Sequence, residues 1–271
     1  MSVPGIVQRK APVNATYINI KYSATAGLLY VDNQEVQKGM DEIRSEYRKT
    51  FGPKEIPRYD EQQNTDFFVS RMIEKNIIGK TQDGKVDAIA IFGRVTNVQL
   101  QQNDSDNKLE TDYLKVTFEV GENDKLNRLV VSLDFNHKLA QNLIPRLLTI
   151  QPGQLAYFCP KPFFNSDDKE KRYPVHGVML NDEHDKPIKR VEGFLEKLKI
   201  KQEEFLSEIR NSGADMKDPD VDAEVKMMLE AQRKAFFMGM FNEVERRFAE
   251  PRKQLEEQLE QDHQMEASMR T

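Results

Sequence analysis

The most constraining feature of this sequence is a pair of consecutive segments in which apolar and polar residues alternate. Residues 113–120 and 126–135 each place apolar side chains at every second position. Side chains of a β-strand point alternately to the two faces of a sheet, so this period predicts two strands with one buried and one solvent-facing side. A β-branched segment, residues 86–100, precedes them and is broken by Gly93. We therefore expect a meander of three strands.

A helix and two more strands are predicted after the meander. Residues 136–150 carry leucine and isoleucine at helical spacing, with Asn136 as the N-cap and a kink expected at Pro145. Residues 154–159 and 174–180 are predicted as strands on the two sides of a charged loop. The predicted order is strand, strand, strand, helix, strand, strand.

This order, over residues 80–183, resembles the OB-fold, a five-stranded and partly open Greek-key barrel. The resemblance is one of topology, and Gly93 is placed where the long first strand of such a barrel bends. The expected fold is α+β, with a five-stranded OB-like β-barrel over residues 80–187. A helical and extended addition over residues 1–79 precedes the barrel, and long C-terminal helices form an acidic tail over residues 188–271.

The two flanking parts are predicted to be largely helical. In the first part, residues 15–31 have extended character, and amphipathic helices are predicted at residues 33–50 and 64–78. In the last part, helices are predicted at residues 188–211 and 218–249, with an interruption at Glu250-Pro251. We expect the N-terminal helices to pack over the barrel.

Composition excludes several classes of protein. The chain has 271 residues, with 40 Lys and Arg against 45 Asp and Glu, and a formal charge of -5. It lacks both a run of ~20 apolar residues and the apolar core of a secretory signal, so we expect no membrane partner and a cytoplasmic location, in the host if the chain is viral. One cysteine, Cys159, and four scattered histidines exclude an intrachain disulfide and disfavour a Cys/His zinc cluster.

Motifs of the common catalytic centres are missing from the sequence. It contains no glycine-rich phosphate loop, no G-x-S-x-G nucleophile turn and no H-E-x-x-H zinc motif. The adjacent Asp167 and Asp168 lie in a charged loop without a basic or histidine partner fixed by the pattern. We therefore predict a protein that is not an enzyme and uses no cofactor and no metal.

The alternation also assigns side chains to the solvent-facing side of the meander. Leu114, Val116 and Phe118 are expected in the core. The opposite face then carries Phe92, Arg94, Tyr113, Lys115 and Arg128. Rings that stack on unpaired bases, with Lys and Arg along the phosphates, are what a sequence-tolerant single-strand binder needs. The alternative is that this face simply meets water or is covered by an N-terminal helix.

The loop predicted between the last two strands is the second part of the expected nucleic-acid site. Its rings and cations are Lys161, Phe163, Phe164, Lys169, Lys171, Arg172 and Tyr173. In OB-folds the loop between strands four and five flanks the binding face, so the resemblance implies that these side chains contact the strand. The alternative is that Phe163 and Phe164 pack into the core.

The acidity of the chain is concentrated in its C-terminal tail. Residues 201–271 hold 11 basic and 17 acidic side chains. The apolar side of the last helix includes Phe236, Phe237, Met240 and Phe241, which we predict as a binding surface for another protein or a second copy of the chain. The alternative is that these side chains complete the core.

The resemblance and the predicted face together point to a single-stranded DNA-binding protein of bacteriophage or bacterial type. We expect binding without strong sequence preference, which protects the strand during DNA replication or recombination. The expected partners are single-stranded DNA, replication or assembly proteins at the C-terminal helices, and further copies in a homo-oligomer. The alternative is a structural or adaptor protein of a virion or assembly that acts only through protein contacts.

Overall fold

The chain forms two compact units in the computed structural model, which describes residues 6–9, 17–52, 62–82, 86–102, 112–121, 127–164, 174–213, 215 and 218–269. The first, named here the sheet unit, comprises Met1–Asn142 and Gln151–Ile188. The second, named the helical unit, comprises Leu143–Ile150 and Lys189–Thr271. The expected class, α+β, is confirmed.

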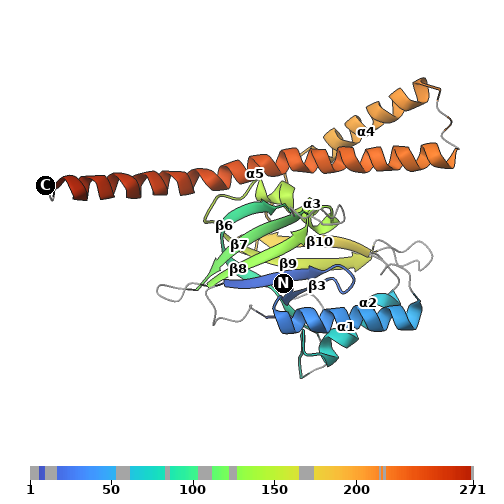
Figure 1. Cartoon of the computed structure of the whole chain (residues 1–271), viewed down its shortest axis with the longest axis horizontal. Helices are drawn as coiled ribbons and strands as arrows, with labels where there is room; N and C mark the ends of the chain where they lie inside the picture. The colour runs from blue at the N-terminus through green and yellow to red at the C-terminus, as the bar shows by residue number, and fades with distance from the viewer. Residues whose placement is uncertain are drawn as a thin grey trace. The chain divides into compact units, whose positions relative to one another are not determined.

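Seven strands of the sheet unit form one curled, open sheet (Figure 1). Their order is β10-β9-β6-β7-β8-β2-β3, and neighbours are antiparallel except for β2 and β8, which are parallel. The strands are β2 (Tyr17–Ser23), β3 (Leu28–Val31), β6 (Ile91–Gln101), β7 (Tyr113–Val120), β8 (Asn127–Asp134), β9 (Leu155–Phe164) and β10 (Pro174–Asn181). The predicted succession is present as β6, β7, β8, α3 (Lys138–Leu147), β9 and β10.

The expectation of a five-stranded OB-like barrel is wrong. Closing five strands in the order β10-β9-β6-β7-β8 would require β8 and β10 to pair with each other. Instead, β2 occupies the edge of β8, with residues 17–21 paired to residues 128–132, and β3 continues the sheet beyond β2. The N-terminal strand thus satisfies the backbone hydrogen bonds of that edge, and the sheet curls without closing.

The curl still brings the two sides of the sheet together through side chains. The hydroxyl group of Tyr22, at the end of β2, forms a hydrogen bond of 2.5 Å with Nδ1 of His176 in β10. The two strands are separated by four others in the sheet order. The N-terminal segment is therefore an integral part of the sheet unit.

The predicted first strand of the meander is two strands in the structure. It is divided at Ala90 into β5 (Val86–Ile89) and β6. β5 belongs to a separate three-stranded sheet with β1 (Ile6–Arg9) and β4 (Gly79–Lys80), in the order β1-β5-β4.

Gly93 is placed where two strands approach closely. A Cβ atom at this position would lie 2.6 Å from the carbonyl oxygen of Glu119 in β7, which is closer than real Cβ contacts. Only glycine leaves room for this approach. The register between β6 and β7 then shifts between Val95 and Asn97, which restores the alternation of buried and outward residues further along β6.

The two N-terminal helices pack on β3 and β5 around a core of their own. They are α1 (Gln34–Phe51) and α2 (Gln62–Glu74), close to the predicted ranges. Asn33 caps α1, because its side-chain oxygen accepts a hydrogen bond of 2.9 Å from the amide of Val36. The shared core includes Leu28, Tyr30, Met40, Ile43, Tyr47, Phe68, Met72 and Ala88.

The helical unit consists of the end of α3 with α4 (Phe194–Asn211) and α5 (Pro219–Met269). The expected interruption at Pro251 is absent, because α5 continues through it. Inside this unit, the guanidinium group of Arg247 donates hydrogen bonds to the carbonyl oxygens of Leu148 and Ile150. These bonds join α5 to the segment that follows α3.

Candidate nucleic-acid interface

The side of β6, β7, β8 and β2 that faces away from the core carries mostly polar residues and is named here the outer face. The alternation predicted for two of these strands is present: Leu114, Val116, Phe118, Leu129, Val131 and Leu133 are buried. The residues at the outward positions of the four strands are Phe92, Arg94, Asn97, Gln99, Tyr113, Lys115, Thr117, Glu119, Arg128, Val130, Ser132, Asp134, Tyr17, Asn19 and Lys21. Residues paired across the four strands lie in rows on this surface.

One of these rows combines cations with an exposed ring. Arg94 lies opposite Glu119, Glu119 opposite Arg128, and Arg128 opposite Tyr17. The ring of Tyr17 is 58% exposed, although it belongs to a strand inside the sheet. This exposure is what stacking of a planar ligand requires.

Arg128 holds the Tyr17 ring in place. Its guanidinium carbon lies 5.6 Å from the ring centroid, and its Nη1 donates a hydrogen bond of 2.8 Å to the Tyr17 hydroxyl oxygen. Its Nε donates a bond of 3.0 Å to the carboxylate of Glu119. The bonds to Tyr17 and Glu119 raise the pKa of Arg128, so the cation is permanent.

A second row carries the lysines of the outer face. Lys115 lies opposite Ser132, and Ser132 lies opposite Lys21. Lys21 forms an ion pair of 3.0 Å with Asp32, whereas Lys115 forms none with a described residue. The outer face has cations at Lys21, Arg94, Lys115 and Arg128 and carboxylates at Glu119 and Asp134. Even with Lys21 neutralised by Asp32, its cations outnumber its carboxylates, in a chain whose total charge is -5.

The residues predicted from the meander are all placed on the outer face, with different exposure. Arg94 and Arg128 are exposed, and Lys115 is half-buried. Phe92 is half-buried and lies opposite Tyr157 of β9. Tyr113 is half-buried in the wall of a pocket described below.

The predicted loop is shorter than expected, because β9 continues to Phe164 and pairs with β10 up to Pro174. The backbone of Lys161, Phe163 and Phe164 therefore lies in β9, while their side chains are outside the described part of the structure. The other predicted loop residues also lie outside the described residues: Lys169, Lys171, Arg172 and Tyr173.

The predicted partner surface of the last helix divides into buried and half-buried residues. Phe237 and Phe241 are buried, and the Phe237 ring contacts Phe194 of α4. Phe236 and Met240 are half-buried. Phe236 also lines a pocket of about 420 Å³ between α4 and α5, where Lys201 lies 5.9 Å from its ring centroid.

Tyr17 and Lys21 were missed by sequence reasoning. The signal was present, since Ile18 and Ile20 are both buried and separate outward positions at every second residue. Segment 15–31 was predicted only as extended, without faces, because its partner strand lies more than a hundred residues away in the chain.

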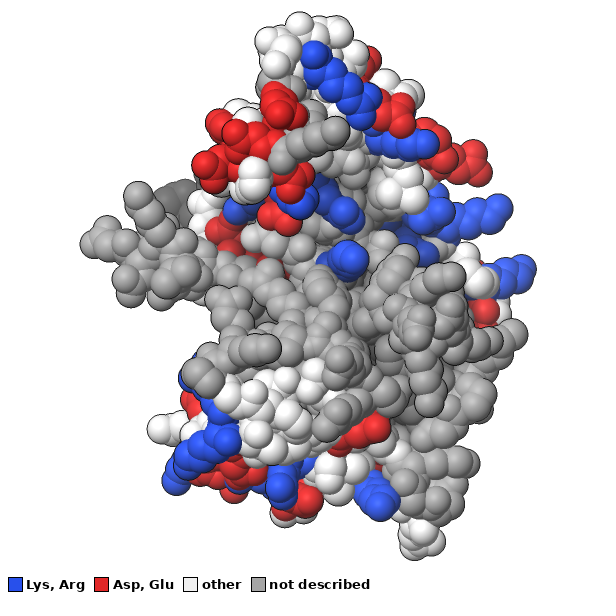
Figure 2. Space-filling model, turned by 90° about the vertical axis from the view of Figure 1, so that its right-hand side faces the viewer, with Lys and Arg blue, Asp and Glu red and all other residues white. Residues whose placement is uncertain are grey.

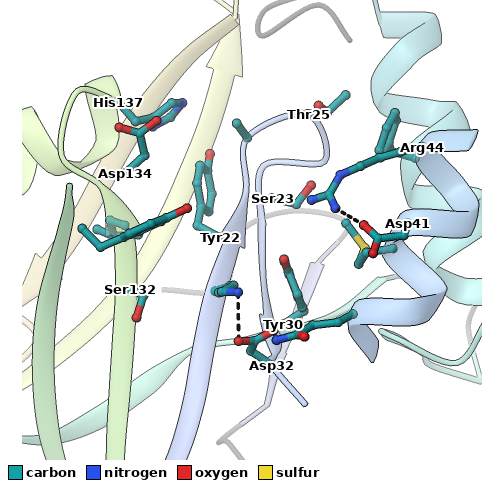
Figure 3. Close-up of a pocket in the computed structure, with 17 residues that line it drawn as sticks. Tyr22, Ser23, Thr25, Tyr30, Asp32, Asp41, Arg44, Ser132, Asp134 and His137 are labelled. Atoms are coloured by element: carbon teal, nitrogen blue, oxygen red, sulfur yellow. Dashed lines mark hydrogen bonds and ion pairs between the residues drawn. The ribbon is translucent and has the colours of Figure 1, made fainter. Parts of the chain in front are cut away.

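A pocket of about 700 Å³ adjoins the outer face in the sheet unit (Figure 3). Four residues belong to both: Lys21, Tyr113, Ser132 and Asp134. Figure 3 shows Arg44 and Asp41 extending from α1 toward the β2–β3 hairpin, with Asp134 and His137 across the pocket. The outer face therefore ends in a cavity bounded by α1 and the β2–β3 hairpin.

The pocket combines aromatic rings with paired charges. Its rings include Tyr22, Tyr30 and Tyr113, and burial raises the pKa of Tyr30 to about 12, so this hydroxyl stays protonated. Arg44 pairs with Asp41 at 2.6 Å in the same lining. Such a cavity suits a flat, polar ligand.

Cys159 is buried, and its thiol donates to the carbonyl oxygen of Pro160 at 3.3 Å. Within the described ranges, no group of three or more His, Cys, Asp or Glu residues is placed to hold a metal ion. None of the described helices has both the length and the apolarity to cross a bilayer.

The outer face carries more cations than carboxylates. On the side of the molecule that Figure 2 presents, Lys and Arg lie among Asp and Glu. Local excess of cations, rather than total charge, decides attraction to a phosphate chain.

We compared the chain with models of protein families, with curated proteins and with solved structures, and nothing in these three comparisons matches it.

Proposed function

We propose that this protein binds single-stranded DNA on the outer face. The observation that carries the proposal is one row of the sheet, in which Arg128 lies beside the exposed ring of Tyr17 and Arg94 follows further along, beyond Glu119. Lys115, without an ion-pair partner among the described residues, adds a cation two positions along β7 from Thr117. No closed barrel is needed for this surface to form.

The chemistry of the row supports binding that tolerates any sequence. An unpaired base stacks on the face of Tyr17, since every base has a π-surface, and the cations follow the phosphates. Arg128 holds the ring in one orientation through its hydrogen bond to the hydroxyl group, which lowers the entropy lost on stacking. Protection of the strand during replication or recombination is the role that follows from such binding.

The proposal is tested by fluorescence anisotropy with a labelled oligo(dT). We expect Tyr17→Ala to weaken binding by about 1 to 3 kcal/mol, the usual loss when one stacked base loses its ring. Tyr17→Phe should keep most of the affinity, because it retains the ring and loses only the oxygen that accepts from Arg128.

Two variants away from the outer face serve as controls. Phe51→Ala removes another exposed ring, at the end of α1, and Lys80→Ala removes an exposed cation of the three-stranded sheet. Both should bind as the unaltered chain does, with urea denaturation confirming that each variant folds. If the unaltered chain does not bind, or if Tyr17→Ala binds as tightly as Phe51→Ala, the proposal is wrong.

The exposed apolar side chains of the helical unit support a second candidate function. Leu195 and Ile200 on α4 and Met227 and Met228 on α5 are each more than 40% exposed. Exposed apolar groups of this kind are frequent in protein–protein contacts. A structural or adaptor protein would form salt-insensitive assemblies without DNA, which static light scattering at low and high salt would detect.

A further inference from the structure

The pocket at the end of the outer face is continuous with the surface proposed to hold the strand. Ser132 and Lys21 lie side by side in one row of the sheet, and both line the pocket. Tyr113, two residues before Lys115 on the same face of β7, lines it too. About 13 Å separate Tyr17 from Lys21 along β2, at ~3.3 Å per residue. A strand stacked on Tyr17 therefore reaches the pocket within a few nucleotides.

The size and rings of the pocket fit a base that leaves the stack. A volume of about 700 Å³ lies within the usual range of small-molecule sites and exceeds what one base needs. Tyr22, Tyr30 and Tyr113 bring rings from three strands to its lining. Proteins that take up extruded bases hold them between such rings and bond to their polar edge.

The charges of the pocket determine whether it favours a ligand group that donates hydrogen bonds or one that is negatively charged. Each of its cations holds a carboxylate, Lys21 that of Asp32 at 3.0 Å and Arg44 that of Asp41 at 2.6 Å. Asp134 forms no ion pair within the described part of the chain, and one of its oxygens accepts from the amide of Asn136 at 2.8 Å. The uncompensated charge is therefore negative, which favours a ligand that donates hydrogen bonds over a phosphate.

We infer that this pocket takes up one nucleobase bearing an exocyclic amino group, which donates to the carboxylate of Asp134. Cytosine, adenine and guanine carry such a group and thymine does not. The inference rests on the proposed function, because the outer face supplies the rest of the strand. It adds a base preference at one position to binding that is otherwise indifferent to sequence.

The test compares three labelled strands: oligo(dT), the same strand with a single dC, and the same strand with a single abasic position. For the unaltered chain we expect the strand with dC to bind roughly five- to 100-fold more tightly than oligo(dT), the range that one base-edge contact gives. The abasic strand should bind no more tightly than oligo(dT).

Variants locate the preference in the pocket. Asp134→Asn keeps an oxygen for the Asn136 amide but loses the charge, and it should abolish most of the preference for dC. Oligo(dT) should bind this variant at least as tightly as the unaltered chain, because the outer face loses a carboxylate. Glu35→Gln is the matched control, since it neutralises an exposed carboxylate of α1 outside the pocket lining. It should keep the full preference.

The outcomes separate this inference from the proposed function. If the unaltered chain binds all three strands equally, or if Asp134→Asn keeps the preference, the pocket is not a base site, while the outer face still holds the strand. If no strand binds at all, both proposals fail. A preference for the dC strand that Asp134→Asn removes and Glu35→Gln keeps supports the pocket as assigned.

Discussion

His176 is a buried histidine of β10. Its side chain points into the curl of the sheet, where the ring centroids of His137 and Tyr22 lie 4.6 and 5.8 Å from its own. Burial lowers the pKa of His176 from 6.5 to about 4, and the charge of nearby Lys138 acts in the same direction. The imidazole is therefore neutral at physiological pH, and its Nδ1 is bonded to the Tyr22 hydroxyl group.

This shift predicts a loss of stability in mild acid. The unfolded chain binds a proton at His176 near pH 6.5, whereas the folded chain does so only near pH 4. Between these values the unfolded state holds more protons than the folded state. The free energy of unfolding should therefore decrease as the pH is lowered, by up to ~1.4 kcal/mol per pH unit from this group. Urea denaturation at several pH values measures the slope.

His176→Gln should reduce the slope in that pH window, whatever its effect on stability at neutral pH. His184→Gln is the control, because His184 is 71% exposed in the turn after β10. It should leave the slope unchanged. A slope that is the same in all three proteins would show that His176 does not couple protonation to folding.

At the scale of elements, β2 determines the architecture of the sheet unit. It separates β8 from β3, and the side chains of Ile18 and Ile20 enter the core. Without this strand, β8 would be an unpaired edge next to an exposed apolar face, which is a template for aggregation.

A new carboxylate should destabilise the protein strongly on the buried face of β2 and hardly at all on the exposed face. Ile20→Asp places a carboxylate at a position with 0% exposure and should cost more than 4 kcal/mol, enough to unfold the sheet unit. Asn19→Asp adds the same group on the exposed side and should change stability by no more than ~0.5 kcal/mol. Urea denaturation followed by circular dichroism compares them. Equal stability of the two variants would mean that β2 is not part of the main sheet.

The faces of the strands and the neighbours within the meander were predicted from the sequence, but the strand that covers the edge of β8 was not. Alternation in residues 113–120 and 127–134 places Tyr113, Lys115 and Arg128 outward, because the period of a strand is a local property. Which strand covers the edge of β8 is decided by a partner more than a hundred residues away, and no local pattern encodes that choice.

The candidate site shows the same division between local and distant information. Three of the four cations of the outer face follow from predicted strands, whereas Lys21 and Tyr17 depend on the unpredicted β2 pairing. The pocket draws its lining from α1, the β2–β3 hairpin and the ends of β7 and β8. A cavity between segments so distant in the chain requires the tertiary structure.

At the scale of the whole molecule, the net charge of the chain and the local charge of the outer face have opposite signs. The chain carries -5 in total, and residues 201–271 alone hold 17 acidic against 11 basic side chains. The outer face has an excess of cations. At ~0.1 M salt, exposed charges are screened beyond about 10 Å, so a strand on the outer face interacts mainly with the cations beside it.

An acidic protein should therefore bind a polyanion with the salt dependence of a basic one. Binding of labelled oligo(dT), measured by anisotropy as NaCl is raised, should weaken linearly on logarithmic axes, with a slope of about -0.7 for each phosphate neutralised on a single strand. Lys115→Ala should make this slope less steep by ~0.7, whereas Lys80→Ala, on the three-stranded sheet, should not change it. If both variants flatten the slope equally, the attraction comes from the net charge of the chain, and the outer face does not hold the strand.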